Sequence, residues 1–212
     1  MKVFVINAYE ERKAKYLTDD RYTIWPAIHW TDVDDKTLEN YHFRHNCKKD
    51  LRQKITACSE SHLACLKHIY DNKIDDCIII EDDAILDFDR LDELKDINEF
   101  CYIGGMLFPP LLKDKKDFVK PTFENGLNEI DTDRFVIHNA HGLYIPNYKC
   151  VGPMTRSTYK KRRAIDVELK HQQLRKEIKL FLYPAISTLH MEDSKKGFTW
   201  SSYKLPDPLF NY

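Results

Sequence analysis

The chain has 212 residues, of which 42% are hydrophobic and 32% charged, a composition typical of folded domains and not of long disordered segments. Its 33 Lys and Arg residues nearly balance 34 Asp and Glu residues, so no overall field attracts nucleic acid, and we expect no nucleic-acid partner. No apolar run approaches the roughly 20 residues that span a bilayer, and no signal-peptide core follows the first residues. We therefore expect a cytoplasmic protein, or a cytosol-facing part of a longer chain, without a transmembrane segment.

Length and cysteine content indicate how the chain is stabilised and how many domains it forms. A chain of this length buries roughly 70% of its unfolded surface on folding, so it needs no disulfide for stability. The six cysteines form no C-x-x-C pair, and several lie in apolar segments, where Cys behaves as a small hydrophobic residue. We expect reduced cysteines and one domain over residues 1–212.

The first third of the chain predicts an α/β fold. Residues 3–6 form a short β-branched apolar run, which predicts a buried first strand opening into a charged loop and helix. Residues 22–30 predict a second strand, which Pro26 confines to a sheet edge. Residues 56–72 carry apolar side chains at helical spacing, with Thr56 as the expected N-cap.

A strand–loop–helix unit follows. Residues 77–80 predict a buried strand that runs into three consecutive acids, and residues 90–100 predict a helix capped by Asp87 or Asp89. Residues 100–107 predict another buried strand, which ends in a pair of glycines. This order indicates a mostly parallel sheet flanked by helices.

The second half carries weaker signals. We expect an exposed loop to about residue 128, one or two strands in 134–147, a basic and largely helical segment in 155–179, and a last strand in 180–189 interrupted by Pro184. The basic run at 160–163 indicates either a solvated helix face or contact with an anionic partner.

The three acids after the third predicted strand, Glu81, Asp82 and Asp83, need a physical explanation. Side chains alternate along an extended backbone, so Glu81 and Asp83 should project to one side and Asp82 to the other. Uncompensated carboxylates beside a core cost several kcal/mol each, so they need cations, hydrogen-bond donors or water. Ligands bind at the carboxyl ends of strands in open α/β sheets, although a solvated turn is the simpler alternative.

Four segments together resemble one family. They read VFVINAYEERKAKY, ITACSESHLACLKHIYDNKIDDCIIIEDDAIL, HGLYIPN and AIDVEL, and they span residues 3 to about 169. Their order is similar to that of glycosyltransferase family 25, which includes lipopolysaccharide and collagen-modifying sugar transferases. The resemblance implies a GT-A fold, with a central, mostly parallel mixed sheet flanked by helices. The same segments also resemble viral glycosyltransferase domains. If the protein is viral, the expected cytoplasmic location is the cytoplasm of the host cell.

The resemblance also implies a metal site. In GT-A enzymes a D-x-D-like motif holds Mn²⁺ or Mg²⁺ on the diphosphate of a nucleotide sugar, and Glu81 and Asp83 match its two ends. Hard divalent cations prefer such oxygen ligands. His190, after the last predicted strand, matches a third ligand, with a surface histidine as the alternative.

Further residues match donor contacts in the family. The resemblance places Val5 and Asn7 toward the base, Arg12 toward ribose or phosphate, and Asp82 toward the ribose or sugar. Ser61 is expected to reach the nucleotide as well. For Arg12 a solvated helix charge is an equally good reading.

Asp166 matches an acid in the acceptor half of the site. Its simplest role is a helix N-cap, but a carboxylate there can also accept the proton of an acceptor hydroxyl. It is the base if the reaction inverts configuration, and it orients the acceptor if configuration is retained.

The expected reaction transfers a hexose or deoxyhexose, such as glucose, galactose or rhamnose, from a UDP-sugar to a hydroxyl of a glycan or glycoprotein. The alternatives are a non-catalytic nucleotide- or glycan-binding module and a receiver-like Mg²⁺-binding signalling domain. The position of the acids, some 80 residues into the chain, argues against the receiver-like domain.

Overall fold

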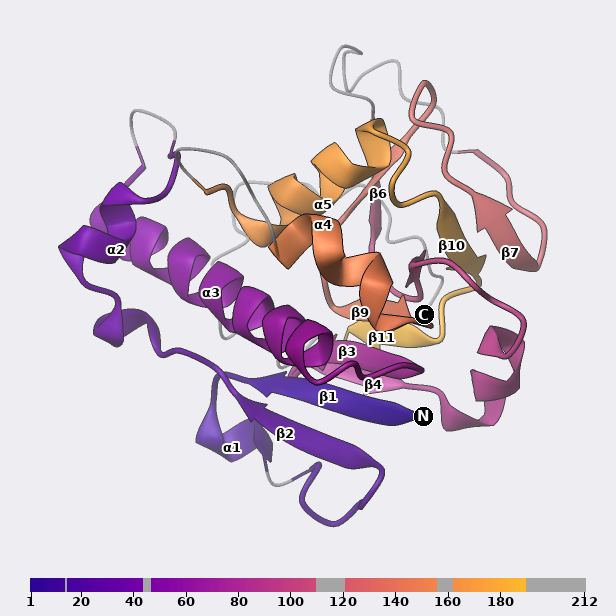
Figure 1. Cartoon of the computed structure of the whole chain (residues 1–212), viewed down its shortest axis with the longest axis horizontal. Coiled ribbons are helices and arrows are strands. Elements are labelled where there is room, and N and C mark those ends of the chain that lie inside the picture. The colour runs from indigo at the N-terminus through magenta and orange to yellow at the C-terminus, as the bar shows by residue number, and fades with distance from the viewer. Residues whose placement is uncertain (14, 44–46, 110–120, 156–161, 190–212) are drawn as a thin grey trace.

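The computed structural model describes residues 1–13, 15–43, 47–109, 121–155 and 162–189, and its centre is a mixed seven-stranded sheet (Figure 1). β1, β2, β3, β5 and β10 run in one direction, whereas β9 and β7 run in the other. In spatial order the strands are β2 (Tyr22–Pro26), β1 (Lys2–Asn7), β3 (Cys77–Glu81), β9 (Gly142–Ile145), β5 (Cys101–Tyr102), β10 (Leu180–Tyr183) and β7 (Gly126–Glu129).

Short strand pairs and helices surround this sheet. The antiparallel pairs are β4 (Ala84–Leu86) with β11 (Ser187–Leu189), and β6 (Met106–Phe108) with β8 (Val136–His138). The α-helices are α1 (Glu10–Lys13), α2 (Asp35–Glu39), α3 (Lys49–Asp71), α4 (Gly152–Thr155) and α5 (Ile165–Leu174), and the 3₁₀ helices are η1 (Trp30–Asp32), η2 (Phe88–Leu94) and η4 (Tyr148–Val151).

Strand alternation divides the core into two layers. Phe4 and Ile79 point to the face covered by α3, α4 and α5, and α3 is the long helix that crosses that face in Figure 1. Val5 and Ile80, one position further along each strand, point to the opposite face, where Leu94 of η2 packs. Both faces of β1 and β3 are therefore buried, which explains why these strands are apolar at successive positions.

This architecture confirms the predicted fold class, an α/β fold of GT-A type with a mostly parallel mixed sheet flanked by helices. β2 lies at the sheet edge, as its proline predicted. None of the helices in the described ranges is long and apolar enough to cross a bilayer. All six cysteines are free.

The predicted start of α3 was wrong. The helix begins at Lys49 after an N-cap at Lys48, and Thr56 is a fully buried residue inside it. Its first two turns hold few buried side chains, so they carry no apolar stripe that could mark the helix in the sequence.

The element after the acids also differs from the prediction. The chain first forms β4 and then a 3₁₀ helix in place of the predicted α-helix. Asp87 caps this helix, as predicted, because its side chain accepts a hydrogen bond from the Asp89 amide. The apolar residues Leu91 and Leu94 are three apart, a spacing that places them on one face in either kind of helix, so it did not distinguish the two.

Two predicted strands stop where the sequence indicated, at the glycine pair and at Pro184. The glycine pair separates β5 from β6, and the cis Tyr183–Pro184 bond separates β10 from β11. Gly104 is required by packing, because a Cβ there would lie 2.6 Å from the carbonyl oxygen of Ser187. The residues at 134–147 form two strands, as one of the alternatives predicted. Residues 110–120 of the predicted exposed loop lie outside the described residues, as does the chain after residue 189. The prediction of a loop to about residue 128 was wrong at its end, because residues 126–129 form β7 by pairing with β10.

Candidate active site

The candidate site lies where β1, β2 and β3 end. Register pairs Ile6 of β1 with Glu81 of β3, and Asn7 with Pro26 of β2, so the three carboxyl ends meet at one edge. The antiparallel β9 begins at the same edge, because Gly142 pairs with Ile80. This edge brings together the loop after β1 and the acids after β3.

Glu81 faces helix α3. Its Oε1 atom lies 2.9 Å from Nε2 of His62 and 3.8 Å from Sγ of Cys58. His62 is fully buried, whereas the Glu81 side chain keeps 28% of its surface exposed. Burial raises the pKa of Glu81, but the hydrogen bond with His62 and the charge of that ring outweigh burial, so the pKa falls below its usual value.

Asp82 faces the opposite side, as alternation predicted, and holds the loop after β1. One carboxylate oxygen accepts from the backbone amides of Ala8 and Tyr9 at 2.7 and 3.1 Å. The other accepts from Nη1 of Arg12 at 2.8 Å, in an ion pair whose side chains are only 5–6% exposed. The Tyr16 hydroxyl donates to the carbonyl oxygen of Ala84 and also lies 3.2 Å from that of Asp82.

The reading of Arg12 as a solvated helix charge was therefore wrong. Its guanidinium is buried against Asp82 and lies over the ring of Tyr9, 4.5 Å from the ring centroid. A direct contact of Arg12 or Asp82 with the nucleotide stays a prediction, because both side chains already have partners within the protein.

Asp83 lies in the turn between β3 and β4. Among the described residues its Oδ1 atom is buried and has no hydrogen-bond partner. Burial and the nearby charge of Glu81 raise the pKa of Asp83 to about 7, and the charge of Arg12 only partly opposes them. The prediction that Asp83 projects beside Glu81 rested on strand alternation, and alternation stops at Glu81 because the strand ends there.

Asp166 is the second residue of α5, and the N-cap is Ala164, so the N-cap role for Asp166 was wrong. Its carboxylate accepts from the amide of Val167 and lies 3.9 Å from Nδ1 of His138. Burial raises the pKa of Asp166, but the nearby His138 ring and the Val167 amide outweigh burial and leave the pKa below its usual value. Its charge also influences the pKa of Glu81, so the two carboxylates share one region.

The other predicted contacts lie behind or beside this edge. Val5 is fully buried in the core, so its side chain does not line the site. The buried Oδ1 atom of Asn7 has no partner among the described residues. The Ser61 hydroxyl donates to Ala57 in its own helix and accepts from the Ile28 amide, which fixes the loop after β2. His190 lies outside the described residues.

Two residues at this edge were not predicted as site residues. Cys58 is exposed and adjoins Glu81, although the sequence pattern placed it on the apolar face of the helix. Cys58 and His62 are four residues apart, and this spacing indicates that they share one helix face. His141 is buried just before β9, and burial lowers its pKa to about 4 although the charge of Glu81 raises it.

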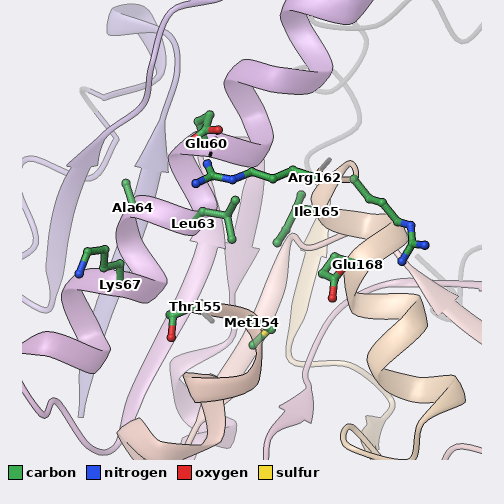
Figure 2. Close-up of a pocket in the computed structure, with 10 residues that line it drawn as sticks. Glu60, Leu63, Ala64, Lys67, Met154, Thr155, Arg162, Ile165 and Glu168 are labelled. Carbon is green, nitrogen blue, oxygen red and sulfur yellow. Dashed lines mark hydrogen bonds and ion pairs between the residues drawn. The ribbon is translucent and has the colours of Figure 1, made fainter. Parts of the chain in front are cut away.

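A separate groove lies between α3, α4 and the start of α5 (Figure 2). Its volume is about 270 Å³, and none of the predicted site residues lines it. Arg162 reaches across to Glu60 of α3 in an ion pair, so this part of the basic run is neither fully solvated nor free of partners.

An acidic strand end in a mixed sheet of this topology is the arrangement of a GT-A-type protein. The chain matches the model of glycosyltransferase family 25 (LPS biosynthesis protein) over residues 2–120. The match covers more than half of the chain, so the protein belongs to glycosyltransferase family 25 and is a glycosyltransferase, not a receiver-like signalling domain. A search of curated proteins finds no match. The family match covers Glu81, Asp82 and Asp83 but not Asp166, and it gives no support for a viral origin.

Removing Arg12 should strongly destabilise the protein, because it leaves the Asp82 carboxylate buried without its cation. We expect Arg12→Ala to lower the free energy of unfolding by about 3–5 kcal/mol in urea titrations. Lys13→Ala is the matched control, because its exposed pair with Glu10 on the same helix contributes under about 1 kcal/mol. Equal stabilities of the two variants would contradict this role for the ion pair.

Asp83 should make the metal-free protein less stable as pH rises. Its pKa is raised from 3.8 to about 7 on folding, so the folded state holds a proton that the unfolded state releases between these values. At pH 8, Asp83→Asn should therefore raise the free energy of unfolding by on the order of 1–3 kcal/mol. Each kcal/mol should raise Tm by about 2–4 °C. At pH 4 the two proteins should melt together. A gain that is the same at both pH values would show that charge is not the cause.

Proposed function

We propose that this glycosyltransferase transfers a hexose or deoxyhexose from a UDP-sugar to a hydroxyl of a glycan or glycoprotein, with Mn²⁺ or Mg²⁺ as cofactor. The observation that carries the proposal is the buried, unpartnered Oδ1 atom of Asp83, within electrostatic reach of Glu81, in a member of a sugar-transferring family. A nucleotide-sugar donor requires a site for a diphosphate, and we place that site at the end of β3.

The residues at this edge fit a divalent cation. The charge of Glu81 disfavours ionisation of Asp83, and a cation bound to both carboxylates would relieve that repulsion. Glu81 and Asp83 would hold Mn²⁺ or Mg²⁺ through oxygen ligands, with His190 as the proposed third ligand. The metal would supply Lewis-acid neutralisation of the charge that develops on the leaving diphosphate.

The loop after β1 supports a donor site next to these acids. Asp82 and Arg12 hold its backbone, and Asn7 at the end of β1 keeps a carbonyl oxygen without a donor among the described residues. The N–H group of a uracil base would satisfy that oxygen, because a buried acceptor without a partner is costly. We therefore place the base near Asn7 and the diphosphate near Asp83.

Asp166 is the proposed base for the acceptor hydroxyl. Its pKa is lowered, so the carboxylate is ionised at neutral pH and can accept a proton, and its side chain is 39% exposed, so an acceptor can reach it. If the reaction retains configuration, the same carboxylate orients the acceptor instead.

A nucleotide diphosphate should stabilise the protein only when metal is present. We expect UDP with Mn²⁺ at about 100 times the dissociation constant to add roughly 2.7 kcal/mol, which a thermal-shift series with UDP, GDP and CDP would detect. Asp83→Ala should lose the metal-dependent part of the shift. An equal shift with UDP in the presence of a chelator would contradict the metal site.

Turnover separates the transferase from a non-catalytic binding module. Hydrolysis or transfer from UDP-glucose or UDP-galactose should depend on Asp166, and we expect Asp166→Asn to lower kcat by about 10²- to 10⁴-fold if it is the base. Glu168→Gln is the control on the same helix, because Glu168 lines the separate groove between α3, α4 and α5 and not the candidate site. Unchanged kcat in Asp166→Asn would exclude the base, and nucleotide binding without any turnover would favour the module.

A further inference from the structure

Three side chains of different chemistry meet on the α3 side of Glu81. They are the thiol of Cys58, the imidazole of His62 and the carboxylate of Glu81, and one ligand atom from each lies within 4.8 Å of the other two. Two of the separations are 2.9 Å, from His62 Nε2 to Glu81 Oε1, and 3.8 Å, from Cys58 Sγ to the same oxygen.

The fold holds these atoms in place through two rigid elements. Cys58 and His62 are four residues apart in the middle of the 23-residue helix α3, so they project from the same face. Glu81 ends β3, which pairs with β1 on one side and β9 on the other. The cluster therefore has little freedom to collapse or to separate.

Its ligand set differs from that of the proposed Mn²⁺ or Mg²⁺ site. Thiolate and imidazole ligands favour zinc over the hard cations, which prefer oxygen. Zinc binds sulfur at about 2.3 Å and nitrogen or oxygen at about 2.0–2.2 Å in a tetrahedral arrangement, which puts neighbouring ligand atoms some 3–4 Å apart. The observed separations require only small side-chain adjustments to reach these values.

The surrounding charge also favours a cation. The carboxylates of Glu81, Asp166 and Asp83 all lie near enough to Cys58 to act on it electrostatically. The Cys58 side chain is exposed, so an ion can reach it. A bound cation would replace the thiol proton, which leaves for solvent.

We propose that Cys58, His62 and Glu81 form a zinc-binding site with three protein ligands and a fourth position open to solvent. This site is distinct from the one formed by Glu81 and Asp83, because it uses the helix side of Glu81 and needs sulfur and nitrogen. Glu81 belongs to both sets, so the two proposed sites share one carboxylate.

One feature of His62 limits the affinity. Its Nδ1 atom is buried and has no hydrogen-bond partner among the described residues. Nε2 carries no proton when it binds metal, so the proton that the neutral ring keeps is on Nδ1, where it lacks the acceptor that usually supports a zinc-bound histidine. The site should therefore bind zinc more weakly than a structural four-ligand zinc site.

The test is a titration of the reduced, full-length protein with Co²⁺, a spectroscopic substitute for zinc, without nucleotide or sugar. Wild type should develop visible cobalt bands of a four-coordinate site and a near-ultraviolet thiolate-to-cobalt band, both displaced by one equivalent of Zn²⁺. Cys58→Ser should lose the thiolate band and bind Zn²⁺ more than about 100-fold more weakly, since even second-shell losses cost 10- to 100-fold.

Cys47→Ser is the matched control, because Cys47 is a partly exposed free thiol outside the cluster. It should keep the wild-type spectrum and zinc affinity. A wild type without the thiolate band, or a Cys58→Ser variant that retains it, would overturn the proposal. Neither readout depends on sugar transfer, so the result stands whatever the outcome for the proposed function.

Discussion

The buried ion pair between Arg12 and Asp82 is the interaction on which the site depends. It joins α1 to the end of β3, and the same carboxylate accepts from two backbone amides of the loop between β1 and α1. Removing Arg12 would leave the buried Asp82 carboxylate without its cation, so the loop and the strand end are held in one arrangement. The neighbouring acids therefore keep fixed positions.

Three consecutive acids acquire three environments because the chain changes direction among them. Glu81, the last strand residue, points to α3; Asp82 points to the opposite side; and Asp83 belongs to a turn, with a buried oxygen that lacks a partner among the described residues. The His62 ring lowers the pKa of Glu81, whereas burial raises that of Asp83. Identical chemistry thus supports a structural role for one carboxylate and ligand binding for the other two.

The same carboxylate, Glu81, connects the two proposed metal sites. With Asp83 it presents oxygen ligands to a hard cation, and with Cys58 and His62 it presents a set suited to zinc. The two proposed sites would lie on different sides of this carboxylate. If both proposals hold, zinc would bind at a residue that also belongs to the proposed donor site.

The sequence by itself determined the α/β class, the edge position of β2, the opposite directions of Glu81 and Asp82, and the family, because periodicity and short motifs are local properties of the chain. It did not determine the first turns of α3 or the β4–β11 pair, because these depend on contacts between distant segments. Only the tertiary structure decided that Arg12 is buried against Asp82 and that Cys58 meets Glu81. Those pairs are separated by 70 and 23 residues, and no local pattern encodes the packing that brings them together.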